Sequence, residues 1–180
     1  MSRLADKINE YKEAFRTKVP LEVQEKMLEV TKKLENSSIS KNALKNGDKA
    51  IEFDLPNESG NKLSLSTILK NNDYAVVSFY RGVWCPYCNL ELKALEQKNE
   101  EFKSLGANLV AISPQSPDSS LSTKEKNELT FDVLSDTNNI IAKEYGLVFS
   151  LDEELRPIYL SFGIDIPSNN KEDSYEIPMP

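Results

Sequence analysis

The stretch FYRGVWCPYCNLELKAL, Phe79–Leu95, decides the fold, because it contains the end of a strand, the start of a helix and both cysteines of the chain. The run YAVVSFY, Tyr74–Tyr80, leads into it and is apolar or β-branched almost throughout, as a strand buried on both faces is. Apolar residues then recur at helical spacing from Tyr87 to Leu105. We therefore predict a buried parallel strand that runs directly into a helix.

The sequence after this junction predicts an α/β fold. NLVAIS, Asn108–Ser113, is a second buried strand, so strand, helix and strand form a βαβ unit with a right-handed crossover. The remaining expectations are a hairpin from Ile51, a loop over Ser113–Ser120 with a short helix from Leu121, a strand FDVLSD, a helix TNNIIAKEYG, and loop from Gly163 to the end.

Two amphipathic helices are expected before this unit. Leu4, Ile8, Tyr11 and Phe15 lie on one stripe of the first helix, and Pro20 separates it from the second. The stripe has two interpretations. It covers the core of its own domain, or it is a dimer arm, although it is shorter than the heptad repeats of a coiled coil.

Composition excludes several classes of function. The 180 residues hold 22 basic and 29 acidic side chains, a net charge of −7, and no histidine. The lack of histidine excludes Ser-His-Asp and Cys-His catalysis and every histidine-ligated metal. The acidic balance argues against nucleic acid as a partner. No run of about 20 apolar residues is present to span a membrane, so we expect a cytoplasmic protein with no membrane partner.

Cys85 and Cys88 carry the chemistry that the sequence predicts. Pro86 suits the first position of a helix, which makes Cys85 the N-cap and puts Cys88 in the first turn. A thiolate at a helix N-terminus accepts backbone N–H bonds, and its pKa falls below the value of about 8.5 for free cysteine. The spacing brings both sulfurs to one face, where they can open and close a disulfide.

Other interpretations of the pair stay open. Half of a zinc site has the same spacing, but zinc needs four ligands, and no other cysteine or histidine is available. Two idle buried thiols are a third interpretation, which the neighbouring Trp84 and Pro86 argue against. Arg81 could hold a thiolate or a peroxide oxygen by charge-assisted hydrogen bonds, or it could be a surface arginine paired with a carboxylate.

The chain resembles the peroxiredoxin-like proteins of the AhpC/TSA group, which have the thioredoxin fold. The resemblance rests on GDKAIEFDLPNESGNKLSLSTIL, FYRGVWCPYCNLELKALE, LVAISPQSPDSSLSTKEKNELTFDVLSD and AKEYGLVFSLDEELRPIY followed by GIDIP. It implies two different alignments of the site. Against the peroxiredoxin pattern, Cys88 is the attacking cysteine and Arg81 occupies a proline position; against the WCxxC of thioredoxin, Cys85 attacks and Cys88 resolves.

The resemblance also implies how the chain divides. Residues 1–46 are expected to be an N-terminal helical extension, and residues 47–180 a thioredoxin-like domain without the C-terminal end of the family domain. Pro180 occupies the position that resembles the family's cis-proline, which abuts the reactive sulfur.

The function expected is a thiol-dependent oxidoreductase without a cofactor. It would reduce a hydroperoxide or a disulfide through the Cys85–Cys88 pair, and an external dithiol such as a thioredoxin would restore the thiols. The alternative is a catalytically silent, redoxin-like binding or scaffold protein whose N-terminal helices recruit a partner. A homodimer is possible in either case.

Overall fold

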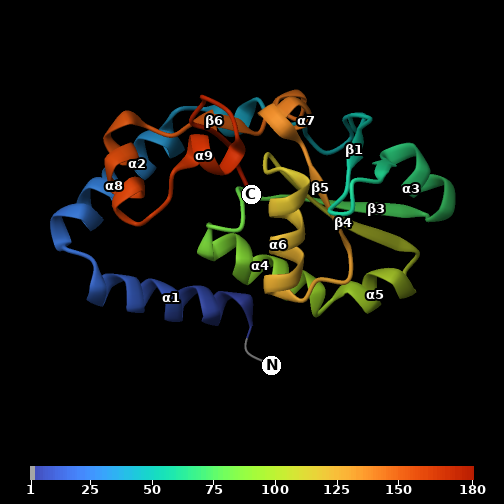
Figure 1. The fold of residues 1–180 in the computed structure, drawn as a ribbon, viewed down its shortest axis with the longest axis horizontal. Helices are drawn as coiled ribbons and strands as arrows, with labels where there is room; N and C mark the ends of the chain where they lie inside the picture. The colour runs from blue at the N-terminus through green and yellow to red at the C-terminus, as the bar shows by residue number, and fades with distance from the viewer. Residues whose placement is uncertain (1–2) are drawn as a thin grey trace.

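Three parallel strands lie side by side at the centre of the computed structural model, which describes residues 3–180 (Figure 1). The helices are α1 Leu4–Lys18, α2 Leu21–Asn36, α3 Leu65–Asn71, α4 Pro86–Glu96, α5 Asn99–Ser104, α6 Pro117–Asn127, α7 Ile140–Glu144, α8 Arg156–Ser161 and α9 Ile166–Asn170, with 3₁₀ turns at Ile39–Lys41, Thr137–Asn139 and Glu153–Leu155. The strands are β1 Asp54–Pro56, β2 Lys62–Ser64, β3 Tyr74–Phe79, β4 Ala107–Ser113, β5 Asp132–Ser135, β6 Val148–Ser150 and β7 Glu176–Pro178.

The central sheet has the order β3-β4-β5, and both pairings are parallel, as the predicted βαβ unit requires. The predicted burial of the strand that enters the cysteine segment holds in part. Side chains of β3 pack into apolar clusters on both faces of the sheet, but most are only partly buried, and Tyr74 at its start is 64% exposed. The more deeply buried strand is β4, which pairs with a strand on each side, whereas β3 lies at an edge.

Three other segments differ from the sequence-based expectation. The single helix expected up to Leu105 is broken into α4 and α5, where Asn99 turns inward and donates to Thr130 Oγ1 at 2.8 Å. The loop expected over Ser113–Ser120 already contains the start of α6, because Pro117 stands at its first position. The polar C-terminal stretch contains α9 and β7, anchored by the buried Ile166 and Ile177.

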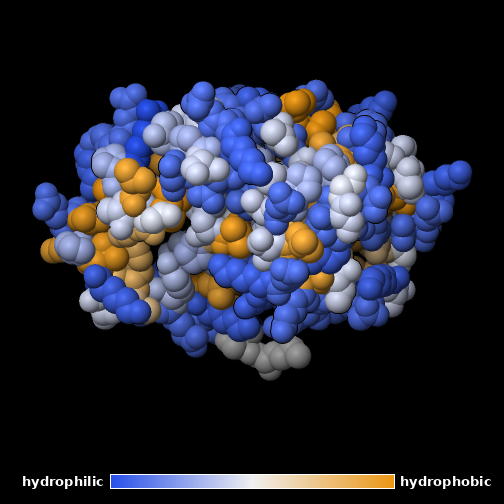
Figure 2. Space-filling view, viewed as in Figure 1, coloured by the Kyte–Doolittle hydropathy of each residue, from blue (hydrophilic) through white to orange (hydrophobic). Residues whose placement is uncertain are grey.

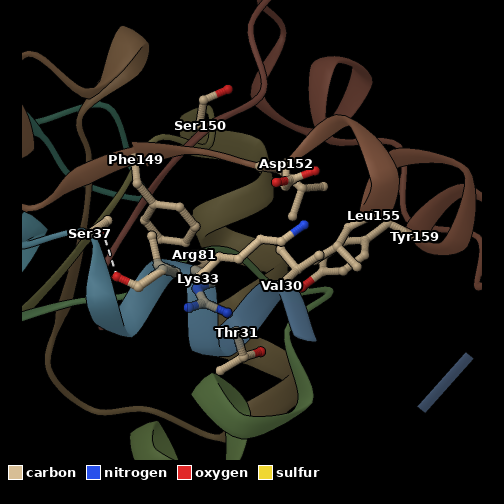
Figure 3. Close-up of a pocket in the computed structure, with 12 residues that line it drawn as sticks. Val30, Thr31, Lys33, Ser37, Arg81, Phe149, Ser150, Asp152, Leu155 and Tyr159 are labelled. Atoms are coloured by element: carbon tan, nitrogen blue, oxygen red, sulfur yellow. Dashed lines mark hydrogen bonds between the residues drawn. The ribbon is translucent and has the colours of Figure 1, made fainter. Parts of the chain in front are cut away.

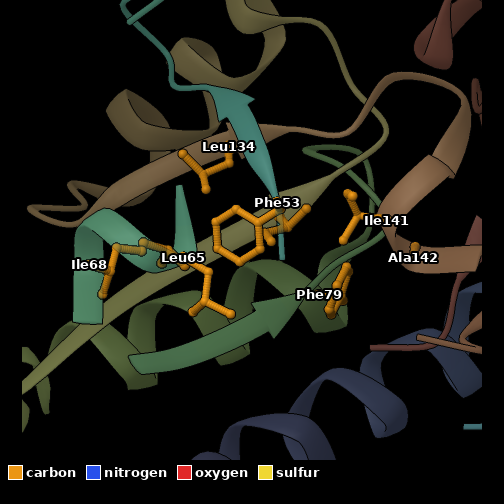
Figure 4. Close-up of a cluster of buried hydrophobic side chains, with 9 residues drawn as sticks. Phe53, Leu65, Ile68, Phe79, Leu134, Ile141 and Ala142 are labelled. Atoms are coloured by element: carbon orange, nitrogen blue, oxygen red, sulfur yellow. The ribbon is translucent and has the colours of Figure 1, made fainter. Parts of the chain in front are cut away.

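Side chains alternate between the two faces of the sheet and form two apolar clusters. One contains Phe53, Leu65, Phe79 and Leu134 beneath the β1–β2 hairpin and α3 (Figure 4). The other contains Tyr80, Leu92 and Val133 together with both cysteines. The redox pair is thus part of the packing between the sheet and α4.

The two predicted N-terminal helices are present, and they pack differently. In α2, Val30 is buried in a third apolar cluster with Leu151 and Leu155. No residue of α1 is fully buried, and α1 packs against α4 at the lower left of the molecule in Figure 1. Apolar surface gathers over α8 (Figure 2), where Leu160 is 62% exposed. In the part of the chain that the structure describes, no helix has both the length and the apolar character to cross a membrane.

Candidate active site

The predicted junction between strand and helix is present. Helix α4 begins at Pro86, and Cys85 is its N-cap, with Sγ accepting the N–H of Cys88 at 3.2 Å. The two sulfurs form a disulfide with their Cα atoms 5.3 Å apart. The cap geometry puts Cys88 in the first turn of α4, on the same face as Cys85.

The segment between β3 and Cys85 is held by side-chain amides that the sequence analysis did not identify. Val83 N–H donates to Gln115 Oε1 at 2.7 Å, and Val83 C=O accepts from Asn89 Nδ2 at 2.8 Å. Asn127 in turn donates to Asn89 Oδ1 at 2.8 Å. Gln115, 1% exposed, comes just after β4. The sequence could have indicated Gln115, because it is a polar residue at the carboxyl end of a buried parallel strand, where the functional sites of α/β proteins usually lie.

The close packing of this segment against Trp84 and Gln115 requires glycine at residue 82. Its φ is +151°, and a Cβ atom at this position would lie 2.6 Å from Trp84 Nε1 and 2.9 Å from Gln115 Cδ. The backbone can therefore pass beneath Trp84 only without a side chain at residue 82.

Both sulfurs are covered. Cys85 is 3% exposed and Cys88 is 1% exposed, so the accessible thiol that a redox function needs is absent from this closed, oxidised form. Cys85 nevertheless lines a cavity of about 130 Å³, whereas Cys88 does not. The other lining residues come from α1, α2, the cysteine segment and the α8 region: Tyr11, Phe15, Met27, Arg81, Trp84, Pro86, Tyr87, Tyr159, Phe162 and Ile164.

Helix α1 forms one wall of this cavity through its apolar stripe. The Tyr11 ring meets the edge of Tyr87 with centroids 5.1 Å apart, and Phe15 meets Phe162 at 6.0 Å. Burial raises the pKa of both Tyr11 and Tyr87, so both phenols are neutral at pH 7. The stripe thus covers its own domain, the first of the two interpretations that the sequence left open.

Arg81 also lines this cavity. Its guanidinium lies 5.5 Å from the centroid of the Phe149 ring, and Figure 3 shows these two side chains. Its Nε is buried without a hydrogen-bond partner, and no carboxylate of residues 3–180 forms an ion pair with it. The interpretation of Arg81 as a surface arginine paired with a carboxylate is therefore wrong. Burial lowers the pKa of Arg81 from its ordinary value, because the cation has lost water without gaining an anion.

Of the other predicted site residues, the structure brings two to the pair and leaves one away from it. Trp84 packs edge-on against Tyr159 with centroids 6.2 Å apart, and Pro86 lines the same cavity. Pro180 follows β7, is exposed, and is not among the cavity-lining residues. Within residues 3–180, no three Cys, Asp or Glu side chains gather as a set of metal ligands.

The site can therefore carry out thiol–disulfide chemistry. It has a disulfide between residues three apart, a helix N-terminus that can stabilise a sulfur anion, and a cation that lines the same cavity. It offers no imidazole, since the chain has no histidine. Proton transfers at the sulfurs thus involve no histidine of this chain.

A sequence model described as "AhpC/TSA family" matches residues 46–165. A putative peroxiredoxin bcp of Buchnera aphidicola is 35% identical over 104 residues, which is 58% of this chain and 65% of that protein. Peroxiredoxin Bcp of Escherichia coli is 29% identical over 106 residues, 59% of this chain and 67% of that protein. The chain thus spans about two thirds of the length of these curated relatives.

The solved structures give a matching fold. The crystal structure of peroxidoxin BcpB from Mycobacterium tuberculosis superposes with a TM-score of 0.56 at 27% identity, covering 60% of this chain and 70% of that one. A peroxiredoxin Q from Xanthomonas campestris, at 20% identity and a TM-score of 0.51, shares the fold over 56% of this chain and 63% of that one.

Proposed function

The chain belongs to the AhpC/TSA family, and from this premise we propose that it is a thiol-dependent oxidoreductase that reduces hydroperoxides or disulfides. The observation that carries the proposal is the Cys85–Cys88 disulfide at the N-terminus of α4. The pair would cycle between this disulfide and a dithiol, with no cofactor.

We propose that Cys85 is the sulfur that reacts with the substrate and with the reductant. Its side chain lines the cavity, whereas that of Cys88 does not and is 1% exposed. An external molecule that approaches through the cavity meets Cys85 first. This supports the thioredoxin-like alignment, in which Cys85 reacts with the substrate and with the reductant, and Cys88 resolves.

With a hydroperoxide the steps balance as follows. The Cys85 thiolate attacks the terminal peroxide oxygen, the O–O bond breaks, and the alkoxide leaves and is protonated to an alcohol. Cys85 is now a sulfenic acid. The Cys88 thiol attacks the Cys85 sulfur, the S–O bond breaks, and water leaves, which gives the disulfide seen here. An external dithiol then reduces this disulfide through a mixed disulfide with Cys85 and is itself oxidised.

Arg81 is the supporting cation in this proposal. It lines the same cavity as Cys85 and carries no internal counter-charge. A positive charge beside the cavity would stabilise the thiolate and the oxygen that becomes negative as the O–O bond breaks. Trp84 and Pro86 fix the position of the sulfur rather than take part in the chemistry.

A partner can reach Cys85 only after part of its cover has moved. Helix α1 is the element suited to move, because none of its residues is fully buried and its contacts over the site are aromatic edges. A protein dithiol such as a thioredoxin would thus react with a form in which α1 has swung away from α4.

The experiment that tests the function is steady-state turnover of hydrogen peroxide and of cumene hydroperoxide with a thioredoxin system as electron donor, beside reduction of insulin disulfides. We expect turnover in at least one of the assays, lost in Cys85→Ser. A folded protein with no turnover in any of them, and no thiol oxidation by peroxide, would favour the silent binding or scaffold protein instead.

A further inference from the structure

A second cavity, of about 400 Å³, lies between α2, β6 and the start of α8 (Figure 3). Arg81 and Tyr159 line it and also line the smaller cavity at Cys85, so the two cavities meet at these side chains. Most of the remaining wall is apolar, and its volume falls in the range typical of small-molecule sites.

Two of the hydroxyl groups in this wall already donate to backbone carbonyls of α2. Thr31 Oγ1 donates to Met27 C=O at 2.8 Å, and Ser37 Oγ donates to Leu34 C=O at 2.6 Å. These two hydroxyl groups therefore have no proton left to donate to a ligand.

The wall contains three charged groups, two cations and one anion. Lys33 Nζ lies 3.0 Å from a carboxylate oxygen of Glu29 and 3.0 Å from one of Glu154. Asp152 Oδ1 accepts the Glu154 N–H at 2.9 Å as an N-cap. Of the two cations, Arg81 has no counter-ion among residues 3–180, and its guanidinium is packed against Phe149.

A desolvated cation without an anion is costly, and proteins ordinarily pair such a group or use it to bind a ligand. A guanidinium presents a planar fork of donors that matches a carboxylate. We propose that this cavity binds an amphipathic monocarboxylate, with its carboxylate on Arg81 and its apolar chain against Val30, Leu34 and Leu155. A single unpaired cation calls for a single negative charge.

The test is calorimetric titration of the oxidised protein with octanoate as the probe, which needs no turnover and so stands apart from the redox proposal. We expect saturable binding at one site per chain. Octan-1-ol, which lacks the charge, acetate, which lacks the chain, and octylammonium, which has the opposite charge, should each bind at least about tenfold more weakly.

Two variants and a control separate binding from folding. Arg81→Met should weaken octanoate binding at least about tenfold, while the ligand-free variant melts at the same temperature or higher, because a buried unpaired charge has been removed. Thr31→Trp should block the cavity from the exposed side of α2 without removing a core residue. Arg156→Met is the control, since that guanidinium already stacks on Tyr175 at 4.1 Å, and it should bind octanoate as the wild type does.

Three results would overturn the assignment. The first is no saturable octanoate binding to the wild-type protein. The second is wild-type affinity in both Arg81→Met and Thr31→Trp. The third is equal binding of octan-1-ol and octanoate, which would make the cavity an apolar site that does not use the cation.

Discussion

The ring of Tyr11 in α1 meets the ring of Tyr87, which lies between the two cysteines, edge to face with centroids 5.1 Å apart. The contact joins an N-terminal helix outside the matched family region to the first turn of the redox helix. Together with the contact between Phe15 and Phe162, this pair of rings holds α1 over the cavity that Cys85 lines.

Weakening the contact between Tyr11 and Tyr87 should speed reduction of the Cys85–Cys88 disulfide. An aromatic pair contributes about 0.5–1.5 kcal/mol, so Tyr11→Ala should raise the population of the open form, and the rate of reduction by a protein dithiol, about two- to tenfold. Lys12→Ala, on the exposed side of the same helix, is the matched control and should react as the wild type does. Identical stopped-flow rates for all three proteins would show that α1 is not the barrier.

The two cysteines should behave differently when each is alone. In Cys88→Ser, peroxide should leave a sulfenic acid on Cys85 that a dimedone-type reagent traps, because no partner thiol resolves it. In Cys85→Ser, the remaining thiol is 1% exposed in the parent structure and should react far more slowly. Mass spectrometry of the trapped adducts decides between the sulfurs; faster trapping on Cys88 would reverse the assigned roles.

The reduced Cys88→Ser variant also allows the Cys85 thiol to be titrated by the pH dependence of alkylation. The N-terminus of α4 and the nearby Arg81 both favour the thiolate. We therefore expect a pKa below that of free cysteine, and a higher value in Cys88→Ser/Arg81→Met. The same pKa in both variants, at or above that of free cysteine, would show that the Cys85 thiol is not activated.

Glu58 ties the β1–β2 hairpin to the sheet and should make stability depend on pH. Burial opposes its charge, but the ammonium of Lys124 and the N–H of Val133 outweigh that effect and hold its pKa below the ordinary value. Because the folded pKa is lowered, the stabilisation is complete above the unfolded value near 4.5 and is lost as pH falls through the folded one.

The measurement is urea unfolding at several pH values. Glu58→Gln should cost about 1–3 kcal/mol at pH 7, and the difference from wild type should shrink as the pH falls below about 4.5. Asp54→Asn breaks the exposed pair with Lys62 and should cost at most about 1 kcal/mol at pH 7. Equal costs at pH 7 and pH 3 for Glu58→Gln would contradict a charged role.

Gly82→Ala should disturb the site itself. The new methyl group would collide with Trp84 and Gln115, in addition to the cost of a positive φ, so we expect a loss of about 1–3 kcal/mol and a changed fluorescence of Trp84, the only tryptophan. Gly60→Ala also places alanine at a positive φ, +79°, but has no atom within 4 Å of the new Cβ. If both variants lost the same stability and kept the same fluorescence, the close approach at Gly82 would have no role.

The sequence predicted the parts of the site that depend on neighbouring residues. Capping preferences placed Pro86 at the first position of α4 and Cys85 before it, and the apolar run of Tyr74–Tyr80 gave β3. These features follow from local rules of helix starts and strand patterning.

What was missed depends on contacts between distant residues. Gln115 reaches Val83 only because β4 pairs with β3, and Phe15 meets Phe162 only once α1 and α8 have been placed. The edge position of β3 is likewise a property of strand order, which an apolar run does not encode. The division at residues 46 and 47 and a homodimer remain predictions.

The redox role of the cysteine pair is tested most directly by the mass and free-thiol count of the fully reduced protein before and after one equivalent of hydrogen peroxide. We expect the loss of two hydrogen atoms and of both thiols, with no oxygen added, as the Cys85–Cys88 disulfide forms. Retention of both thiols, or stable addition of oxygen without a disulfide, would contradict it.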